Sequence, residues 1–194
     1  MMDGEVKTMK YLIASDLHGS AEHVGKLMDA WEREAADGMI LLGDILYHGP
    51  RNALPDDYDT KKVIAMLNPL AYKITAVRGN CDAEVDQMVL EFPITADFIN
   101  LMADGRRFFL THGHRYNPIE PPLDLAAGDV MLSGHTHVPA SFRSPEGVWF
   151  LNPGSVSIPK NGSPHSYMTY ESGLFLWKTL SGEIYRELDL KGED

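Results

Sequence analysis

Residues 10–18 read Lys-Tyr-Leu-Ile-Ala-Ser-Asp-Leu-His, a short apolar run that ends in a polar cluster. A run of this length, bounded by polar residues, predicts a buried strand over Lys10–Ser15. Two further runs, Met39–Leu42 and Lys73–Val77, have the same character and are also followed by polar residues. Helical patterns lie between the three runs, so this half of the chain predicts an α/β arrangement.

The two helical patterns have recognisable ends. Ser20 is a good N-cap for the first helix, and Gly38 is expected to end it. Thr60 is expected to cap the second helix, which should stop at Pro69. The stretch Gly43–Tyr58 contains two prolines and several Asp and Asn residues, which predicts a long loop.

The second half of the chain has the character of strands and tight turns. Thr95–Met102 and Arg106–Thr111 flank Asp104-Gly105, a dipeptide that favours a hairpin. Further strands are expected at Val130–Ser133, Ser141–Arg143, Trp149–Leu151, Ser166–Tyr170, Leu174–Thr179 and Glu183–Leu190. No linker divides the chain, so we expect one α/β domain over residues 1–194, with residues 1–9 as an extended tail. Two mixed β-sheets should pack face to face with helices on the outside, an α/β/β/α layering.

Composition and charge restrict the partners. Of the 194 residues, 44% are hydrophobic and 23% are charged, which is typical of a globular chain and argues against disorder. Seventeen Lys and Arg against 28 Asp and Glu give a net charge of −11, so neither nucleic acid nor an anionic membrane is an expected partner. The single cysteine, Cys81, excludes an internal disulfide and fits a cytoplasmic location. A phosphate ligand would need strong local positive charge, for which a bound cation is the natural source.

Metal-ligand residue types follow five of the predicted strands. These sets are Asp16-Leu17-His18, Gly43-Asp44, Gly79-Asn80-Cys81-Asp82, His112-Gly113-His114 and His135-Thr136-His137. Because ligand sites in α/β sheets lie beyond the carboxyl ends of the strands, the five loops are expected to converge.

The spacing of these residues suggests how they could hold cations. In an extended backbone, residues two apart point to the same side, so Asp16 and His18 could bind one ion while Leu17 faces the core. His135 and His137 could supply one ligand to each of two ions, and the Asp44 carboxylate could bridge them. Oxygen and imidazole donors without thiolate suit Mn²⁺, Fe²⁺ or Zn²⁺ better than Mg²⁺.

Each of these motifs alone is weak evidence, since Asp-x-His and Gly-Asp are common in ordinary turns and caps. The alternative is a domain with scattered, hydrogen-bonded histidines, which would place six of its eight histidines near strand ends by accident. His23, at a helix start, is expected to be exposed, and His165 lies in a loop. Neither of these two histidines is assigned a role.

The ordered set Asp-x-His, Gly-Asp, Gly-Asn, His-Gly-His and Gly-His-Thr-His resembles the calcineurin-like metallophosphoesterases. The stretches 43–55, 78–82 and 152–159 make the chain similar to bacterial phosphodiesterases of that family, and the resemblance runs from Lys10 to about Leu190. It implies the layered two-sheet fold, two metal ions that are usually manganese, and hydrolysis of a small phosphodiester by a hydroxide that both ions activate.

The resemblance also implies the roles of individual residues. One metal would be held by Asp16, His18 and His137, and the other by Asn80, His112 and His135, with Asp44 bridging both. The catalytic residues would be Asp44, Asn80, His112 and His114. The loops suggest further substrate or pocket residues, namely His48, Arg51, Asn52 and Cys81.

Cys81 departs from the superfamily, in which a histidine after the ligand Asn is proposed to protonate the leaving alkoxide. The thiol could donate a proton or could only shape the pocket. Two alternatives to a phosphodiesterase stay open: a phosphomonoesterase or nuclease of the same fold, and a catalytically silent scaffold like the retromer subunit of this superfamily. Similar bacterial proteins tend to self-associate, so a dimer or tetramer is a further expectation.

Overall fold

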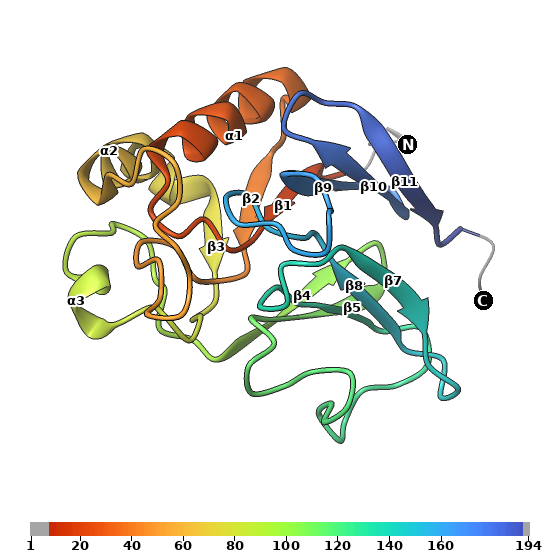
Figure 1. Ribbon diagram of the computed structural model, residues 1–194. Helices are drawn as coiled ribbons and strands as arrows, with labels where there is room; N and C mark the ends of the chain where they lie inside the picture. Colours follow the sequence, from red (N-terminus) through yellow and green to blue (C-terminus); the bar gives the residue numbers. More distant parts are fainter. Residues whose placement is uncertain (1–7, 192–194) are drawn as a thin grey trace.

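The computed structural model describes residues 8–191, which form two β-sheets that lie face to face (Figure 1). The first sheet has six strands in the order β11-β10-β9-β1-β2-β3. Its strands are β1 (Tyr11–Ala14), β2 (Gly38–Leu41), β3 (Ile74–Ala76), β9 (Ser166–Glu171), β10 (Leu174–Thr179) and β11 (Ile184–Asp189). β1, β2 and β3 pair in parallel, whereas the β1–β9, β9–β10 and β10–β11 pairs are antiparallel.

The second sheet has five strands in the order β4-β5-β6-β8-β7. They are β4 (Phe98–Ala103), β5 (Arg106–Thr111), β6 (Val130–Leu132), β7 (Ala140–Arg143) and β8 (Trp149–Asn152). The β5–β6 and β6–β8 pairs are parallel and the outer pairs are antiparallel. Both sheets are therefore mixed, which confirms the predicted fold class.

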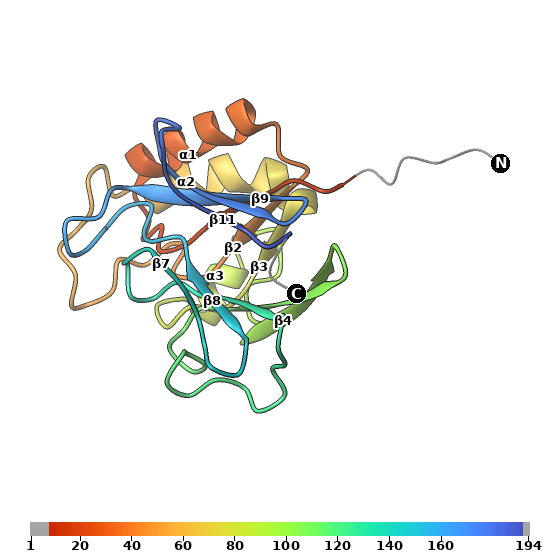
Figure 2. The same ribbon diagram turned by 90° about the vertical axis from the view of Figure 1, so that its right-hand side faces the viewer.

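The helices lie mainly on one side of the two sheets. α1 (Ala21–Glu34) and α2 (Thr60–Leu67) cover the outer face of the six-stranded sheet (Figure 2). A 3₁₀-helix (Asn68–Lys73) follows α2, and the four-residue α3 (Glu84–Gln87) follows β3. On the outer face of the five-stranded sheet, the predicted helical layer is replaced by the irregular segment 113–129, whose Tyr116 and Leu125 pack against β5, β6 and β8. This segment contains three prolines, which prevent a regular helix there.

The alternation of side chains along the strands explains the layers. Leu12 and Met39 point to the helices, whereas Ile13 and Ile40 point to the second sheet. β1 and β2 are buried on both faces, apart from the half-buried Tyr11, because helices cover one face and a sheet covers the other. The continuous apolar runs in the sequence are the consequence of this double burial.

Three local predictions are wrong. α1 ends at Glu34 with Ala35 in the left-handed region, and Gly38 begins β2 instead of ending the helix. Asp59 is the N-cap of α2, and its side chain accepts a hydrogen bond from the Lys62 amide, so Thr60 is the first helical residue. His23 is buried, because its ring stacks on His165 from the other end of the chain at 4.1 Å.

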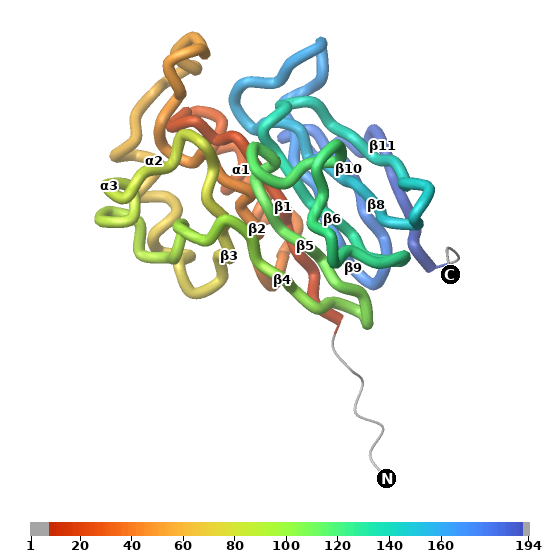
Figure 3. The backbone as a smooth tube through the Cα atoms, turned by 90° about the horizontal axis from the view of Figure 1, so that it is seen from below, coloured from red at the N-terminus to blue at the C-terminus, as the bar shows by residue number. Residues whose placement is uncertain are grey.

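The loops that follow β1, β2 and β6 lie at one end of the molecule, opposite the start of β1 (Figure 3). Of the predicted N-terminal tail over residues 1–9, only Thr8 and Met9 are among the described residues, and they belong to no helix or strand. Within residues 8–191, none of the helices has the length and apolar character needed to span a bilayer.

Glu34 joins α1 to the six-stranded sheet through a buried cluster of charges. Its carboxylate accepts hydrogen bonds from Lys178 at 2.8 Å, Tyr167 at 2.7 Å and Lys10 at 3.0 Å. Burial alone would raise the pKa of Glu34, but these donors outweigh it and lower the pKa to about 2. The ionised carboxylate is therefore part of the packing between α1, β9 and β10.

We predict that Glu34→Gln lowers the free energy of unfolding by about 3–5 kcal/mol, because Lys178 is left buried without its counter-charge. In the wild-type protein this stabilisation is complete above about pH 5 and is lost as the pH falls toward 2, since the pKa of Glu34 is lowered on folding. Urea unfolding at several pH values measures both effects. Glu22→Gln, which removes an exposed ion pair with Lys26, is the matched control. Equal stability of Glu34→Gln and wild type would contradict the account.

Candidate metal centre

The seven predicted ligand residues meet at one edge of the two sheets. Each follows a strand, and their order along the chain is Asp16 and His18 after β1, Asp44 after β2, Asn80 after β3, His112 after β5, and His135 and His137 after β6. All five loops come from parallel-paired strands, whose carboxyl ends share an edge. The five loops therefore converge at one edge of the sheets, as predicted.

The backbone brings these residues together by a different route from the one expected. Asp16 and His18 are not in extended backbone: their φ angles are +57° and +47°, in the left-handed region. Asp44, His135 and His137 also have positive φ, at +55°, +66° and +60°. Asp16 and His18 therefore do not share a side through extended backbone, contrary to the prediction, although Leu17 is fully buried as expected.

Two glycines allow the loops after β2 and β3 to touch. Gly43 has a φ of +94°, and a Cβ there would lie 2.5 Å from the backbone nitrogen of Gly79. A Cβ on Gly79 would lie 2.1 Å from Oδ1 of Asp44. Any side chain at either position would separate Asp44 from the Asn80 loop.

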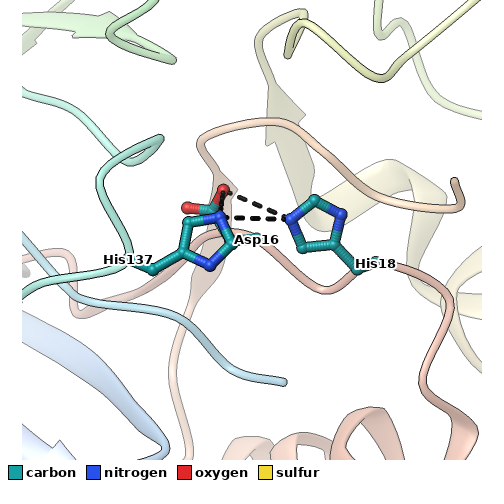
Figure 4. A group of neighbouring side chains, drawn as sticks. All are labelled: Asp16, His18 and His137. Carbon is teal, nitrogen blue, oxygen red and sulfur yellow. Dashed lines mark hydrogen bonds and ion pairs between the residues drawn. The ribbon is translucent and has the colours of Figure 1, made fainter. Parts of the chain in front are cut away.

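Asp16, His18 and His137 form the first cluster (Figure 4). Oδ1 of Asp16 lies 3.2 Å from Nε2 of His137 and 3.6 Å from Nε2 of His18. The two Nε2 atoms are 3.3 Å apart. Asp16 is fully buried, and its Oδ1 makes no hydrogen bond within the described residues. Oδ1 of Asp16 and the Nε2 atoms of His18 and His137 are therefore three possible metal-ligand atoms that face one another.

The opposite ring nitrogens determine which way the lone pairs face. Nδ1 of His18, His137 and His112 lies 2.8, 2.6 and 2.7 Å from the backbone carbonyls of Tyr47, Ile158 and Leu42 respectively. A carbonyl can only accept, so each Nδ1 carries a hydrogen, and each ring, when neutral, presents its Nε2 lone pair to the site. Lone pairs that face one another at 3.3 Å fit a shared cation, and this arrangement of ligand histidines is usual at metal sites.

His112 is the centre of the second cluster. Its Nε2 lies 3.0 Å from Oδ1 of Asn80 and 3.3 Å from Nδ1 of His135. Oδ2 of Asp44 lies 3.4 Å from Nε2 of His112 and 3.7 Å from Nε2 of His18, between the two clusters. The donor set therefore fits a pair of divalent cations with one carboxylate between them.

The electrostatics of the clusters favour positive charge at their centre. Burial alone would raise the pKa of Asp16, but His137 and His18 outweigh it and lower the pKa well below its usual value of 3.8. Burial lowers the pKa of His112, whereas Asp44 and Asp16 outweigh it and raise the pKa to about 9. The carboxylates thus hold either protons on the imidazoles or a cation in their place, and the two compete.

A pocket of about 420 Å³ opens over the two clusters, where Asp44, Asn80, His135 and His137 belong to its lining. Three of the predicted pocket residues line it, namely Arg51, Asn52 and Cys81. Lys160, which the sequence analysis did not single out, lines it as well. Two cationic side chains, those of Arg51 and Lys160, therefore line the pocket beside the metal-ligand residues. They could pair with the anionic part of a ligand.

His48 and His114 do not line this pocket. The His48 ring lies edge-on to Tyr47 and Tyr58, at 4.8 and 5.3 Å between centroids. The His114 ring lies 5.5 Å from that of His112. Burial and the nearby His112 lower the pKa of His114 to about 4, so its ring is neutral at pH 7.

Asp82 holds the loops together, a role that the sequence analysis missed. Its carboxylate accepts hydrogen bonds from the backbone amides of Asp44 and Ile45, both at 2.8 Å, and Gly79, at 2.7 Å. The only signal in the sequence was an acidic residue two positions after Asn80. On the other side of the site, the hydroxyls of Ser155 and Ser157 donate to the carbonyl of Asp16 at 2.8 and 3.0 Å, so the segment after β8 backs the site.

The fold and the two adjoining clusters of metal-ligand residues define a metallophosphoesterase architecture, and comparison with known families agrees. Residues 9–173 match the calcineurin-like phosphoesterase superfamily domain. The chain belongs to this superfamily.

Particular relatives are similar over most of the chain. The phosphodiesterase YfcE of Escherichia coli (strain K12) is 48% identical over 159 residues, which cover 82% of this chain and 85% of that protein. A solved structure of the E. coli phosphoesterase YfcE covers 94% of this chain and 100% of that one, with a TM-score of 0.90 and 43% identity. The zinc complex of Vps29 from Entamoeba histolytica covers 94% of this chain and 100% of its own with a TM-score of 0.64. At 20% identity, the likeness to Vps29 shows the fold alone.

We predict that Asp82→Asn weakens Mn²⁺ binding about 10- to 100-fold, because an amide cannot accept from all three backbone amides that position Asp44 and Gly79. It should also lower the midpoint of thermal unfolding. Calorimetric titration of Mn²⁺ measures the first effect. Asp59→Asn, at the residue whose side chain caps α2 by accepting from the Lys62 amide, is the control and should leave the affinity unchanged. An unchanged affinity in Asp82→Asn would refute the role of this residue.

Proposed function

We propose that this protein is a metal-dependent phosphodiesterase that hydrolyses small phosphodiesters at the two adjoining clusters. The observation that carries the proposal is the set of acceptor atoms that face one another around Asp44, next to a pocket with Arg51 and Lys160 on its lining. The superfamily and the 48% identity to the phosphodiesterase YfcE support the same reaction.

We assign the proposed ligands from these distances and from the family resemblance. Asp16, His18 and His137 would hold one cation; Asn80, His112 and His135 would hold the other. Asp44 would contact both, because its Oδ2 lies between Nε2 of His18 and Nε2 of His112. Mn²⁺ suits this mixture of oxygen and imidazole donors. When bound, two such ions lower the pKa of an attacking water and neutralise charge on the phosphoryl group.

The side chains of the pocket would bind and orient the substrate. Arg51 and Lys160 carry fixed positive charge that can pair with the non-bridging phosphate oxygens. Nδ2 of Asn52 donates to the carbonyl of His48 at 2.8 Å, and this bond fixes the loop that carries Arg51. His114 would contribute less than the resemblance implies, since other residues line the pocket.

Cys81 is placed beside the site but is a poor proton donor. Burial and the Asp44 carboxylate raise the pKa of its thiol to about 12. Proton transfer by a positioned acid contributes roughly 10²–10⁴-fold, and is most effective when the pKa of the acid lies near the working pH. We therefore expect diesters with good leaving groups, such as nitrophenolate, to react much faster than dialkyl esters.

The charge and the single free cysteine complete the proposal. The net charge of −11 favours a small diester over a nucleic acid, whose many phosphates it would repel. A reducing cytoplasm suits the free thiol of Cys81. A dimeric or tetrameric assembly stays a prediction.

The experiment that tests the proposal combines chelation with a panel of esters. Protein stripped by chelator should remain folded by circular dichroism and be inert, and Mn²⁺ should restore activity better than Mg²⁺. Bis(p-nitrophenyl) phosphate should then react faster than p-nitrophenyl phosphate, and diethyl phosphate should react slowest. Asp44→Ala should abolish turnover and lower metal occupancy at both positions, since Asp44 is the shared ligand.

Three results would overturn the proposal in different ways. A faster reaction with the monoester would make the protein a phosphomonoesterase. Preference for a polynucleotide over the small diester would make it a nuclease. No turnover with any metal, in protein that binds two ions, would favour the scaffold alternative.

A further inference from the structure

A second hollow lies beside the metal centre and differs from it in chemistry. It has a volume of about 440 Å³ and its apolar lining comes from Leu46, Tyr47, Tyr58, Ile64, Val85 and Val89. It lies between the loop after β2, the helix α2 and the segment around α3, which are neighbours in Figure 1. Cys81 belongs to the lining of both hollows, so the two adjoin at this residue.

Large apolar side chains on this lining are turned to solvent. Val85 is 63% exposed, Val89 44% and Tyr47 41%, in a chain that buries most of its aliphatic residues. Exposed apolar side chains that line a concave site next to a few polar groups are the usual composition of a small-molecule pocket. Thr60, Lys61 and Asp86 supply the polar groups here.

Hydrogen bonds of the main chain fix the position of the hollow relative to the metal centre. The carbonyl of Tyr47 accepts the hydrogen bond from Nδ1 of His18 at 2.8 Å. The amide of Cys81 donates to Oδ1 of Asp44 at 2.8 Å. Tyr47 and Cys81 thus position two proposed metal ligands and also line the hollow. A molecule bound at the metal centre would therefore have a fixed position relative to the hollow.

Tyr58, another residue of the lining, is held in place by the segment that precedes α1. Its backbone pairs with Ser20 in an isolated β-bridge, and a Cβ on Gly19 would lie 2.6 Å from its ring. With Tyr47 and the edge-on ring of His48, it forms an aromatic group along one side of the hollow. Flat rings bind well against such surfaces.

We propose that this hollow is the subsite for a flat, apolar ester group of the phosphodiester, whose phosphate lies over the metal centre. The inference rests on the proposed function and narrows its substrate class to diesters with at least one aryl-like group. The occupant is part of the substrate because the hollow adjoins, at Cys81, the pocket that would hold the phosphate. A second protein copy would instead need about 800 Å² of buried surface per partner, far more than this hollow offers.

The test compares the binding of two diesters that differ only in their ester groups and that lack the activated nitrophenolate leaving group. Diphenyl phosphate and diethyl phosphate carry the same charge, and their dissociation constants for the Mn²⁺-loaded protein are measured by calorimetry. We expect diphenyl phosphate to bind about tenfold more tightly or better, from burial of one ring. Val85→Trp fills the hollow and should reduce this ratio to about one or two.

Matched variants keep the test independent of folding. Met88→Trp adds the same ring at a residue near Val85 that is 82% exposed and outside the lining, and it should keep the wild-type ratio. Val89→Trp fills the hollow from another position and should act like Val85→Trp. Thermal unfolding of each variant checks that it is folded.

The outcomes separate this inference from the proposed function. Equal affinities for the two phosphates in the wild type, or a ratio that survives both filling variants, would overturn the subsite. Altered oligomer size in both Val85→Trp and Met88→Trp would identify the surface as a contact between copies and also overturn it. Absence of metal-dependent hydrolysis would overturn the proposed function instead, because the calorimetric ratio requires no turnover.

Discussion

The left-handed backbone at the strand ends is the constraint on which the site depends. Five of the seven proposed ligand residues have positive φ, although none is glycine. Each such residue costs on the order of 1–3 kcal/mol and persists only where its surroundings determine it. In extended backbone, the chain would continue along the strand direction and would take each ligand side chain away from the neighbouring loops. The left-handed turn instead directs the side chains of successive loops toward one another.

Hydrogen bonds to the backbone offset this cost. Asp82 accepts from three amides of the loops after β2 and β3, and Ser155 and Ser157 bind the carbonyl of Asp16. Three of the four ligand histidines contribute as well, because Nδ1 of His18, His112 and His137 donates to carbonyls of neighbouring loops. The same bonds that stabilise the turns orient the imidazoles, so the strain and the geometry of the site have one origin. Loops fixed in this way need little reorganisation when a cation binds.

Much of the fold could be predicted, because the double burial of β1 and β2 leaves continuous apolar runs in the sequence. The hairpin at Asp104-Gly105 and the polar residues after each strand are equally local signals. Contacts between distant segments carry no such signal. The sequence around His23 does not reveal that His165 covers it, and α3 has too few residues to show a period.

The features of the site likewise divide into those with a local sequence signal and those that depend on contacts between distant segments. Residue types and order in the sequence indicated the seven candidate ligands, but not why they converge, since the turn conformation is set by tertiary contacts. Asp82 acquires its role only when the loops after β2 and β3 meet, and Lys160 reaches the pocket from a loop near the other end of the chain. The apolar hollow is formed by three segments, none of which is unusual by itself.

The central claim of the proposed function is that the Asp44 carboxylate would contact both of two bound cations. Electron paramagnetic resonance of the Mn²⁺-saturated protein, with metal analysis of the same sample, tests it most directly. Two ions that share a bridging carboxylate are close enough for their electron spins to couple, since such pairs lie roughly 3.5–4 Å apart. The account predicts two Mn²⁺ per chain and a spin-coupled spectrum. One Mn²⁺ per chain, or two with only the six-line spectrum of isolated ions, would contradict it.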